Sequence, residues 1–346
     1  MDLGIFSNGQ RHNAIAADSY AEDLYEIVVA DRLGYREAWV SEHIGVHRPD
    51  TQPAPELLLA AAAMKTKQIR LGVAVRGLPL FHPIDVAMQA SACDHLTGGR
   101  YLFGFGAAGT GSHQMEQRGL DFDERHARME EALDLILKCW TSPAPFDYAG
   151  QFYCGTAINM LPKPYQKPYP PIAMATETDQ YIEFAARRGY SFLMSQYESK
   201  TTLRHKAGTY VDAAAAAGLQ GARRKLNVCR NVYVSTSVAQ AKRELRATAG
   251  QDMEDIRTHF PRLFAHHMPA SGRIEDVNFD QLIEAGMFIV GDPDTVYDGI
   301  KSVYDATGGF GLLMVVMGKD WGSRANRARS LSLLKQEVGP RLAALN

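Results

Sequence analysis

Residues 69–105, IRLGVAVRGLPLFHPIDVAMQASACDHLTGGRYLFGF, read as a strand, a helix and a second strand. The apolar run Ile69–Val75 predicts a strand, and Pro83 suits the first turn of the helix that follows. The Gly98–Gly99 pair then turns the chain into Tyr101–Phe105, a second apolar strand. A helix between two such strands is the crossover that joins neighbouring parallel strands, so this stretch predicts a parallel sheet.

The same alternation of strand and helix continues along the chain, about eight times in all. It is typical of parallel strands with crossover helices, in either an open sheet or a closed barrel. About eight units in roughly 250 residues favour the barrel, and no Gly-x-Gly-x-x-Gly turn follows the first strand to indicate a dinucleotide-binding open sheet. We therefore predict an α/β protein, a (β/α)8 TIM barrel, with strands at residues 3–6, 37–40, 69–75, 101–105, 172–175, 192–194, 228–234, 288–290 and 312–316.

Two segments break this rhythm and are predicted to be insertions. Residues 141–171 hold seven prolines, and the stretch PFDYAGQFYCG within them indicates a small hairpin. Residues 249–287 hold the His266–His267 pair and follow no clear pattern. No linker or change in composition divides the chain, so we expect a single barrel domain over residues 1–346.

The composition is that of an ordinary globular protein, with 46% hydrophobic and 22% charged residues in 346. A net charge of −2 gives no basic excess for nucleic acid. The four cysteines form no Cys-x-x-Cys pair, which argues against a disulfide scaffold or a zinc ribbon. The longest apolar run, Leu57–Met64, is too short to span a bilayer, and the N-terminus lacks the pattern of a signal peptide. These features predict a soluble, cytoplasmic protein.

The stretch WVSEHIGVH, residues 39–47, places an ionisable pair, Glu42 and His43, where the second strand ends. In a (β/α)8 barrel the active site lies at the C-terminal ends of the strands. Histidine is the side chain that most readily carries a proton near pH 7. The position therefore predicts catalytic roles for His43 and Glu42, with a solvated loop pair as the alternative.

A metal site in the same stretch is not expected. His43 and His47 have the spacing of two metal ligands on one helix, but Gly45 and Pro49 argue against a helix here. No third histidine or matching carboxylate follows at a suitable spacing.

Other strand ends carry small or polar residues. Ala74–Val75 would let a flat ligand approach the backbone, and the Gly-rich loop 104–112 exposes N–H groups that can hold an anion. Thr176–Asp179 runs straight into a helix, whose N-terminus favours a phosphate, although simple capping is an alternative. Ser195–Gln196 adds polar groups after the sixth strand. Together these features predict a barrel rim that binds a planar, phosphorylated cofactor.

Several stretches, taken in order, resemble the bacterial luciferase-like flavin monooxygenases over nearly the whole chain. They are SEHIGVH after the second strand, RLGVAVRGLPLFHP at 70–83, GGRYLFGFG at 98–106, LDFDERHARMEEALDLILKCW at 120–140 and GDPDTVYDGIKSVYDATGGFG at 291–311. Within that family, the stretch PAPELLLAAAAMKTKQIRL at 53–71 and the C-terminal tail resemble those of limonene and diketocamphane monooxygenases.

The resemblance implies roles for individual residues. His43 would act near the reactive edge of the flavin, and the Ala74–Val75 peptide would be cis beneath the isoalloxazine ring. Gly106 and Ala107 stand where the family pattern has a cysteine and an arginine. This chain therefore lacks one of the two arginines that bind the cofactor phosphate in that pattern. Thr176, Glu177 and Thr178 would form the phosphate-binding turn, and Arg125 would be the arginine that reaches the phosphate. The full set of residues expected to bind the cofactor is Ala74, Val75, Gly106, Arg125, Thr176, Glu177, Thr178 and Ser195.

The implied reaction is two-component oxygenation. A separate flavin reductase would supply FMNH2, since the chain has no nicotinamide fingerprint. A C4a-peroxyflavin would then carry oxygen to a hydrophobic organic substrate, by Baeyer–Villiger oxidation, hydroxylation or epoxidation. The resemblance also implies a homodimer.

Three alternatives stay open on sequence alone. The same barrel could serve a deazaflavin F420-dependent oxidoreductase, although those relatives often carry Asp-His where this chain has Glu42-His43. A flavin-binding relative that has lost turnover is the second alternative, and an unrelated barrel enzyme is the third.

Overall fold

A computed structural model describes residues 1–9, 16–44, 52–109, 114–259, 261–268, 271–316 and 321–345. Eight parallel strands form a closed ring, because β10 pairs with both β9 and β12, and β12 pairs with β1. The predicted (β/α)8 barrel is thereby confirmed. In ring order the strands are β1 (Asp2–Ser7), β2 (Glu37–Val40), β3 (Arg70–Val73), β5 (Tyr101–Gly106), β8 (Ile172–Ala175), β9 (Ser191–Met194), β10 (Leu226–Val234) and β12 (Leu312–Val316).

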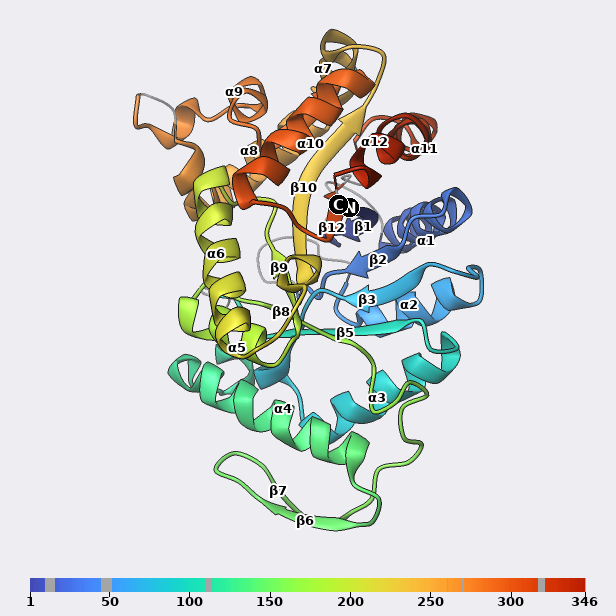
Figure 1. The fold of residues 1–346 in the computed structure, drawn as a ribbon, viewed down its shortest axis with the longest axis vertical. Helices are drawn as coiled ribbons and strands as arrows, with labels where there is room; N and C mark the ends of the chain where they lie inside the picture. Colours follow the sequence, from blue (N-terminus) through green and yellow to red (C-terminus); the bar gives the residue numbers. More distant parts are fainter. Residues whose placement is uncertain are drawn as a thin grey trace.

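Helices follow the strands and surround the ring (Figure 1). Their starts carry the expected signals: Pro83 stands in the first turn of α3, and the Ser199 side chain caps α6. The helices around the ring are α1 (Ala16–Leu33), α2 (Pro55–Ala63), α3 (Pro83–Leu96), α4 (Arg125–Thr141), α5 (Asp179–Arg187), α6 (Lys200–Ala216), α7 (Val238–Leu245), α10 (Pro293–Thr307), α11 (Arg324–Leu333) and α12 (Gly339–Ala343).

The core has two parts. A large cluster fills the space between the strands and the helices, and a smaller one fills the inside of the ring. Trp39 of β2 dominates the inner cluster, with aliphatic side chains from five other strands around it. A β-carbon on Gly72 or Gly104 would come within 3.2 Å or less of that indole ring, so the two glycines leave space for it.

One predicted strand lies outside the ring. β11 (Phe288–Gly291) pairs with Asn231–Val234, the C-terminal half of β10, whereas the N-terminal half of β10 pairs with β9 and β12. β10 has nine residues, so it is long enough to pair with the ring strands along its first half and with β11 along its second. Nine predicted strands therefore give eight ring strands and one additional strand.

The two predicted insertions have different structures. Residues 141–171 contain the predicted hairpin, β6 (Phe146–Ala149) and β7 (Cys154–Ile158), which Figure 1 shows on the outer side of α4. The Glu131 carboxylate on α4 accepts the N–H groups of residues 151–153 and so anchors the hairpin turn. Residues 249–287 contain α8 (Ala249–His259), α9 (Phe279–Glu284) and two short 3-10 helices.

The two ends of the chain meet on one side of the barrel (Figure 1). β1 pairs with β12 from Asp2–Leu312 to Phe6–Val316, which closes the ring. The Met1 amino group also donates to the Leu342 carbonyl, 3.4 Å away. The C-terminal helical segment is divided into α11, a π-helical turn and α12, because Pro340 cannot donate to the helical ladder.

No described helix is both long and apolar enough to cross a membrane. Within the described ranges, no group of three or more His, Cys, Asp or Glu side chains is placed to hold a metal ion. His47, one member of the spacing considered above, lies outside these ranges.

Candidate active site

The strand ends bring most of the predicted site residues to one rim of the barrel. Glu42–His43 follow β2, Ala74–Val75 follow β3, Gly106 ends β5, Thr176–Thr178 follow β8, and Ser195 follows β9. In a parallel barrel these ends all lie on one face. Arg125 comes from elsewhere, as the first residue of α4.

Glu42 belongs to a buried ion-pair network. Its carboxylate accepts a hydrogen bond from Arg76 Nη1 at 2.5 Å and another from the Gly77 N–H at 3.1 Å. Arg76 also pairs with Glu56 of α2 at 3.2 Å and donates to Gln89 of α3 at 2.5 Å. The Glu42 and Arg76 side chains are only 3% and 4% exposed. The network therefore fixes the β2 end to α2 and α3.

Charge is unevenly balanced in this network. Burial raises the pKa of Glu42 to about 7, although Arg76 and the Gly77 N–H oppose the shift. Burial would lower the pKa of Arg76, but Glu56 and Glu42 outweigh it and the pKa is raised. One guanidinium thus faces two carboxylates, and the negative charge of the second, Glu56, also raises the pKa of Glu42.

His43 is half-buried at the rim, and its backbone is fixed. Its N–H donates to the carbonyl of Gln52, 3.0 Å away. Gln52 itself is fully buried. A fixed backbone limits where the imidazole can reach, which is what a proton-transferring group requires.

Small residues form a flat patch where β3 and β5 end. β3 ends at Val73, two residues earlier than predicted, and the Ala74–Val75 peptide that follows is cis, as the resemblance implied. A β-carbon on Gly106 would lie 3.0 Å from Val75 Cγ2 and 3.2 Å from the Ala175 carbonyl oxygen. Ala74, Val75 and Ala175 pack on the cluster inside the ring, so the rim has an apolar floor.

The turn after β8 is not a simple helix cap. Thr178 is the N-cap of α5, yet its side chain makes no capping hydrogen bond. Its Oγ1 instead lies 3.4 Å from Thr176 Oγ1, and its N–H donates to that same Thr176 atom at 3.3 Å. The alternative of plain side-chain capping is therefore wrong for Thr178, and the first N–H groups of α5 lie beside two hydroxyl groups.

Side chains of α4 and α5 join the start of the helix that carries Arg125 to the helix that follows this turn. His126 of α4 stacks on Tyr181 of α5 with ring centroids 4.6 Å apart, and Tyr181 donates to Glu130 at 2.5 Å. The Arg125 guanidinium lies 4.1 Å from the Phe122 ring centroid and donates to the Phe122 carbonyl at 3.1 Å. Arg125 is half-buried, and both of these contacts of its guanidinium are with Phe122.

Sequence reasoning missed the buried cations behind the rim. Lys206 of α6 pairs with Glu198 at 2.5 Å and donates to the Thr176 carbonyl at 3.4 Å. Arg230 of β10 donates to the carbonyls of Ser195, at 3.1 Å, and Glu198, at 2.8 Å. Burial lowers the pKa of Arg230 to about 10. An arginine inside the apolar strand LNVCRNVYV was the signal that would have revealed this cluster.

Comparison with known proteins gives consistent matches. A family model described as luciferase-like monooxygenase matches residues 1–309. The 4-hydroxyprotoasukamycin monooxygenase of Streptomyces nodosus subsp. asukaensis is 30% identical over 90% of this chain and 84% of its own length. Limonene 1,2-monooxygenase of Rhodococcus erythropolis is 27% identical over 98% of this chain and 86% of its own. The oxygenating constituent of 3,6-diketocamphane monooxygenase of Pseudomonas putida, solved with FMN, superposes with a TM-score of 0.87 at 24% identity, over 99% and 98% of the two chains.

Two further proteins match the chain. The oxygenase component of the flavin-dependent trigonelline monooxygenase of Acinetobacter baylyi is 26% identical over 84% of this chain and 81% of its own. The coenzyme F420-dependent tetrahydromethanopterin reductase of Methanopyrus kandleri shares the fold, with a TM-score of 0.70 at 19% identity over 98% and 99% of the two chains.

Proposed function

Because this chain belongs to the luciferase-like monooxygenase family and is a flavin-dependent monooxygenase, we propose that it is the oxygenase component of a two-component system that uses reduced FMN. Its partners would be a separate flavin reductase, O2 and a hydrophobic organic substrate. The observation that carries the proposal is the single rim that holds His43, the flat Ala74–Val75 and Gly106 patch, and the open start of α5.

The residues of the rim fit FMN. The floor between Val75, Gly106 and Ala175 has no room for further side-chain atoms and would lie against a planar ring. The N–H groups and hydroxyls of Thr176 and Thr178 suit a phosphate, and Arg125 lies on the neighbouring helix. Glu177 and Ser195 complete the set that we propose as contacts of the cofactor.

In this proposal each part of the rim has a chemical task. Bound reduced FMN supplies the electrons that activate O2. His43 holds or moves a proton at the reacting edge, which decides whether oxygen reaches the substrate as a nucleophile or as an electrophile. Glu42 orients the β2 end through Arg76 and Gly77. Apolar residues of the floor keep water away, because water would divert oxygen to hydrogen peroxide.

The purified protein should take up O2 and oxidise substrate only when a flavin reductase, FMN and NADH are all present. Product formation and oxygen uptake are measured with each component, this protein included, left out in turn. Limonene and 3,6-diketocamphane, for which two relatives are named, are the first substrates. Substrate oxidation with NADH alone would contradict the proposal.

Arg125→Ala should weaken FMN binding by about 1.5–3 kcal/mol, the usual range for a hydrogen bond to a charged group. Riboflavin has no phosphate, so its affinity should change by less than a factor of two. Titration calorimetry with both ligands measures the difference. Arg128→Ala is the matched control, because Arg128 lies one turn further along α4 and pairs with Glu124. Equal losses for FMN and riboflavin in Arg125→Ala would show that Arg125 only supports the start of the helix.

An F420-dependent oxidoreductase is the second candidate, and the shared fold of the F420-dependent reductase favours it. Such an enzyme transfers hydride and needs no O2. Adding reduced F420 or reduced FMN in turn under anaerobic conditions separates the two, since only the true cofactor will bind tightly. A relative without turnover would bind reduced FMN yet oxidise none of the substrates offered.

We also propose that the protein is a homodimer whose interface includes the outer faces of α2 and α3. Large apolar side chains are exposed there: Leu57 by 74%, Met64 by 67%, Met88 by 43% and Leu96 by 50%. Such a patch is typical of protein–protein contacts. Sedimentation analysis should give twice the 38.2 kDa chain mass, and Leu57→Glu with Met64→Glu should give the monomer. A monomeric parent protein would contradict the proposal.

A further inference from the structure

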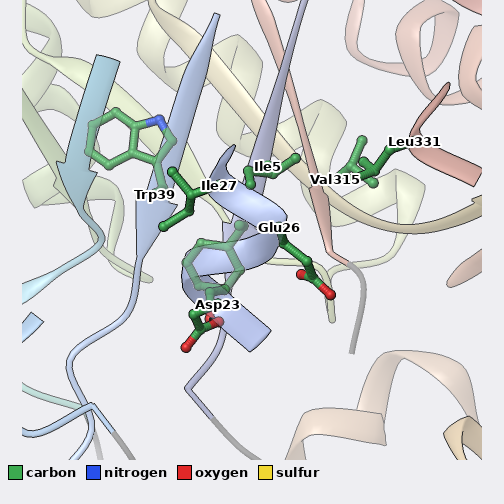
Figure 2. Close-up of a pocket in the computed structure, with 9 residues that line it drawn as sticks. Ile5, Asp23, Glu26, Ile27, Trp39, Val315 and Leu331 are labelled. Carbon is green, nitrogen blue, oxygen red and sulfur yellow. Dashed lines mark hydrogen bonds between the residues drawn. The ribbon is translucent and has the colours of Figure 1, made fainter. Parts of the chain in front are cut away.

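Asp23, on the side of α1 that faces the barrel, is a buried carboxylate with two identified partners. It is 1% exposed. Its Oδ1 accepts a hydrogen bond from Ser7 Oγ at 2.6 Å, and its Oδ2 accepts one from Gln52 Nε2 at 2.5 Å. Figure 2 shows Asp23 and Glu26 projecting from α1, with Ile27 between the helix and Trp39. The bond from Gln52 to Oδ2 therefore holds the Gln52 side chain against α1.

Gln52 connects this carboxylate to the rim. Its side chain donates to Asp23, and its backbone carbonyl accepts the N–H of His43 at 3.0 Å. Gln52 is fully buried, so neither of these contacts is shared with bulk solvent. The side chain and the carbonyl carbon of Gln52 are both bonded to its Cα, so holding the side chain in place limits how far the carbonyl can move.

The neighbouring backbone is shaped around Gln52. Gly9, two residues after β1, has a φ of +70°, and a β-carbon there would lie 2.3 Å from Gln52 Cγ. The Ser7 carbonyl accepts the N–H of Ser41 at 2.9 Å, which ties the ends of β1 and β2 together. Only glycine at position 9 leaves space for the Gln52 side chain in this arrangement.

From these contacts we infer that Asp23 is a positioning residue for His43, acting through the side chain and carbonyl of Gln52. The inference rests on the proposed role of His43. Asp23 is distant from His43 in the sequence. It would act by holding the His43 backbone in the one place from which the imidazole reaches the reacting edge.

A pair of exchanges tests this connection. Gln52→Glu removes the donor and sets a second carboxylate against Asp23. Adding Asp23→Asn to the same chain restores the hydrogen bond with its direction reversed, because the new amide at position 23 donates and the new carboxylate at position 52 accepts. Asp23→Asn alone should be mild, because the Gln52 amide can turn over and accept. Glu26→Gln is the matched control: Glu26 lies one turn along α1, is also buried, and pairs with Arg327 at 2.7 Å, away from Gln52.

The first measurement is hydrogen exchange at the His43 amide, which requires no flavin. The exchange rate of the His43 amide is compared with that of the Ala74 amide, which donates to the Val40 carbonyl at 2.8 Å on the same rim. Gln52→Glu should speed His43 exchange about 10- to 100-fold relative to Ala74, the loss expected for one hydrogen bond to a charged group. The double variant should return it to within about threefold of the parent, and Glu26→Gln should leave the ratio unchanged.

The second measurement is the share of O2 released as hydrogen peroxide in the presence of reductase, FMN and substrate. Gln52→Glu should raise that share, lower kcat more than it raises KM, and be rescued by Asp23→Asn. Unchanged His43 exchange in Gln52→Glu would overturn the inference, whatever the protein catalyses. If the His43 amide exchanges faster in Gln52→Glu but the share of O2 released as hydrogen peroxide is unchanged, the position of the His43 backbone does not control the reaction, and the proposed role of Asp23 is wrong. If the parent oxidises no substrate, the proposed function fails, whereas the exchange result still decides whether Asp23 positions His43.

Discussion

His43→Ala should lower product turnover by about 10²–10⁴-fold, the usual contribution of a general acid or base. His43 follows β2 on the face where barrel enzymes carry out their chemistry, and its backbone is fixed by Gln52. The variant should fold normally and bind FMN as the parent does, because no predicted phosphate contact is altered. Oxygen uptake should continue, with hydrogen peroxide replacing most of the product.

The measurement is product and hydrogen peroxide formed per NADH consumed, with reductase in excess. His95→Ala is the matched control, since His95 lies at the far end of α3, where it contacts the Lys163 carbonyl and the Tyr165 ring. Glu42→Gln should cause a milder loss, because an amide still accepts from Gly77. If His43→Ala couples oxygen to product as well as the parent does, the end of β2 is only a loop.

Arg76→Leu should lower the free energy of unfolding by about 3–5 kcal/mol, the usual effect of removing one partner of a buried ion pair. The change would leave the carboxylates of Glu42 and Glu56 buried without their shared cation. It would also remove the stacking of the guanidinium on Phe81, whose ring centroid is 3.9 Å away. Urea unfolding at pH 7 measures the loss.

A triple variant, with Glu42→Gln and Glu56→Gln added to Arg76→Leu, should recover much of that stability, because no buried charge is then left uncompensated. Arg187→Leu is the control for an exposed pair: Arg187 and Glu183 are 59% and 39% exposed, and the loss should be below about 1 kcal/mol. A loss in Arg76→Leu as small as that of the control would show that the network is solvated.

Local signals were enough to predict the barrel. Helix α3 has the predicted bounds, Pro83–Leu96, because a proline starts it and Gly98–Gly99 follow its end. β12 also has its predicted bounds, since its apolar run has clear limits. β11 reads equally well as a strand, but nothing local shows that it pairs only with the end of β10. Membership of the ring depends on pairing over a long range, which periodicity does not report.

The site was predictable where residues follow strands and unpredictable where side chains meet across the fold. His43, Gly106 and Thr178 could be placed because each sits at or just after the end of a predicted strand. Arg76 was visible beside Ala74–Val75, yet its partner Glu56 comes from another helix. Lys206 likewise joins Thr176 across 30 residues. Such contacts exist only once the helices have packed, so no spacing in the sequence reveals them.

The seam between β1 and β12 has a consequence for protein synthesis. The two strands that close the ring are separated by about 300 residues, as the pairing of Asp2 with Leu312 shows. At roughly 5–20 residues per second, a ribosome needs roughly 15–60 s to make that interval. During this time one edge of β1 has no partner, and the apolar lining of the ring stays open to other nascent chains. A cell that makes this protein must therefore shield an unfinished barrel until its last strand emerges.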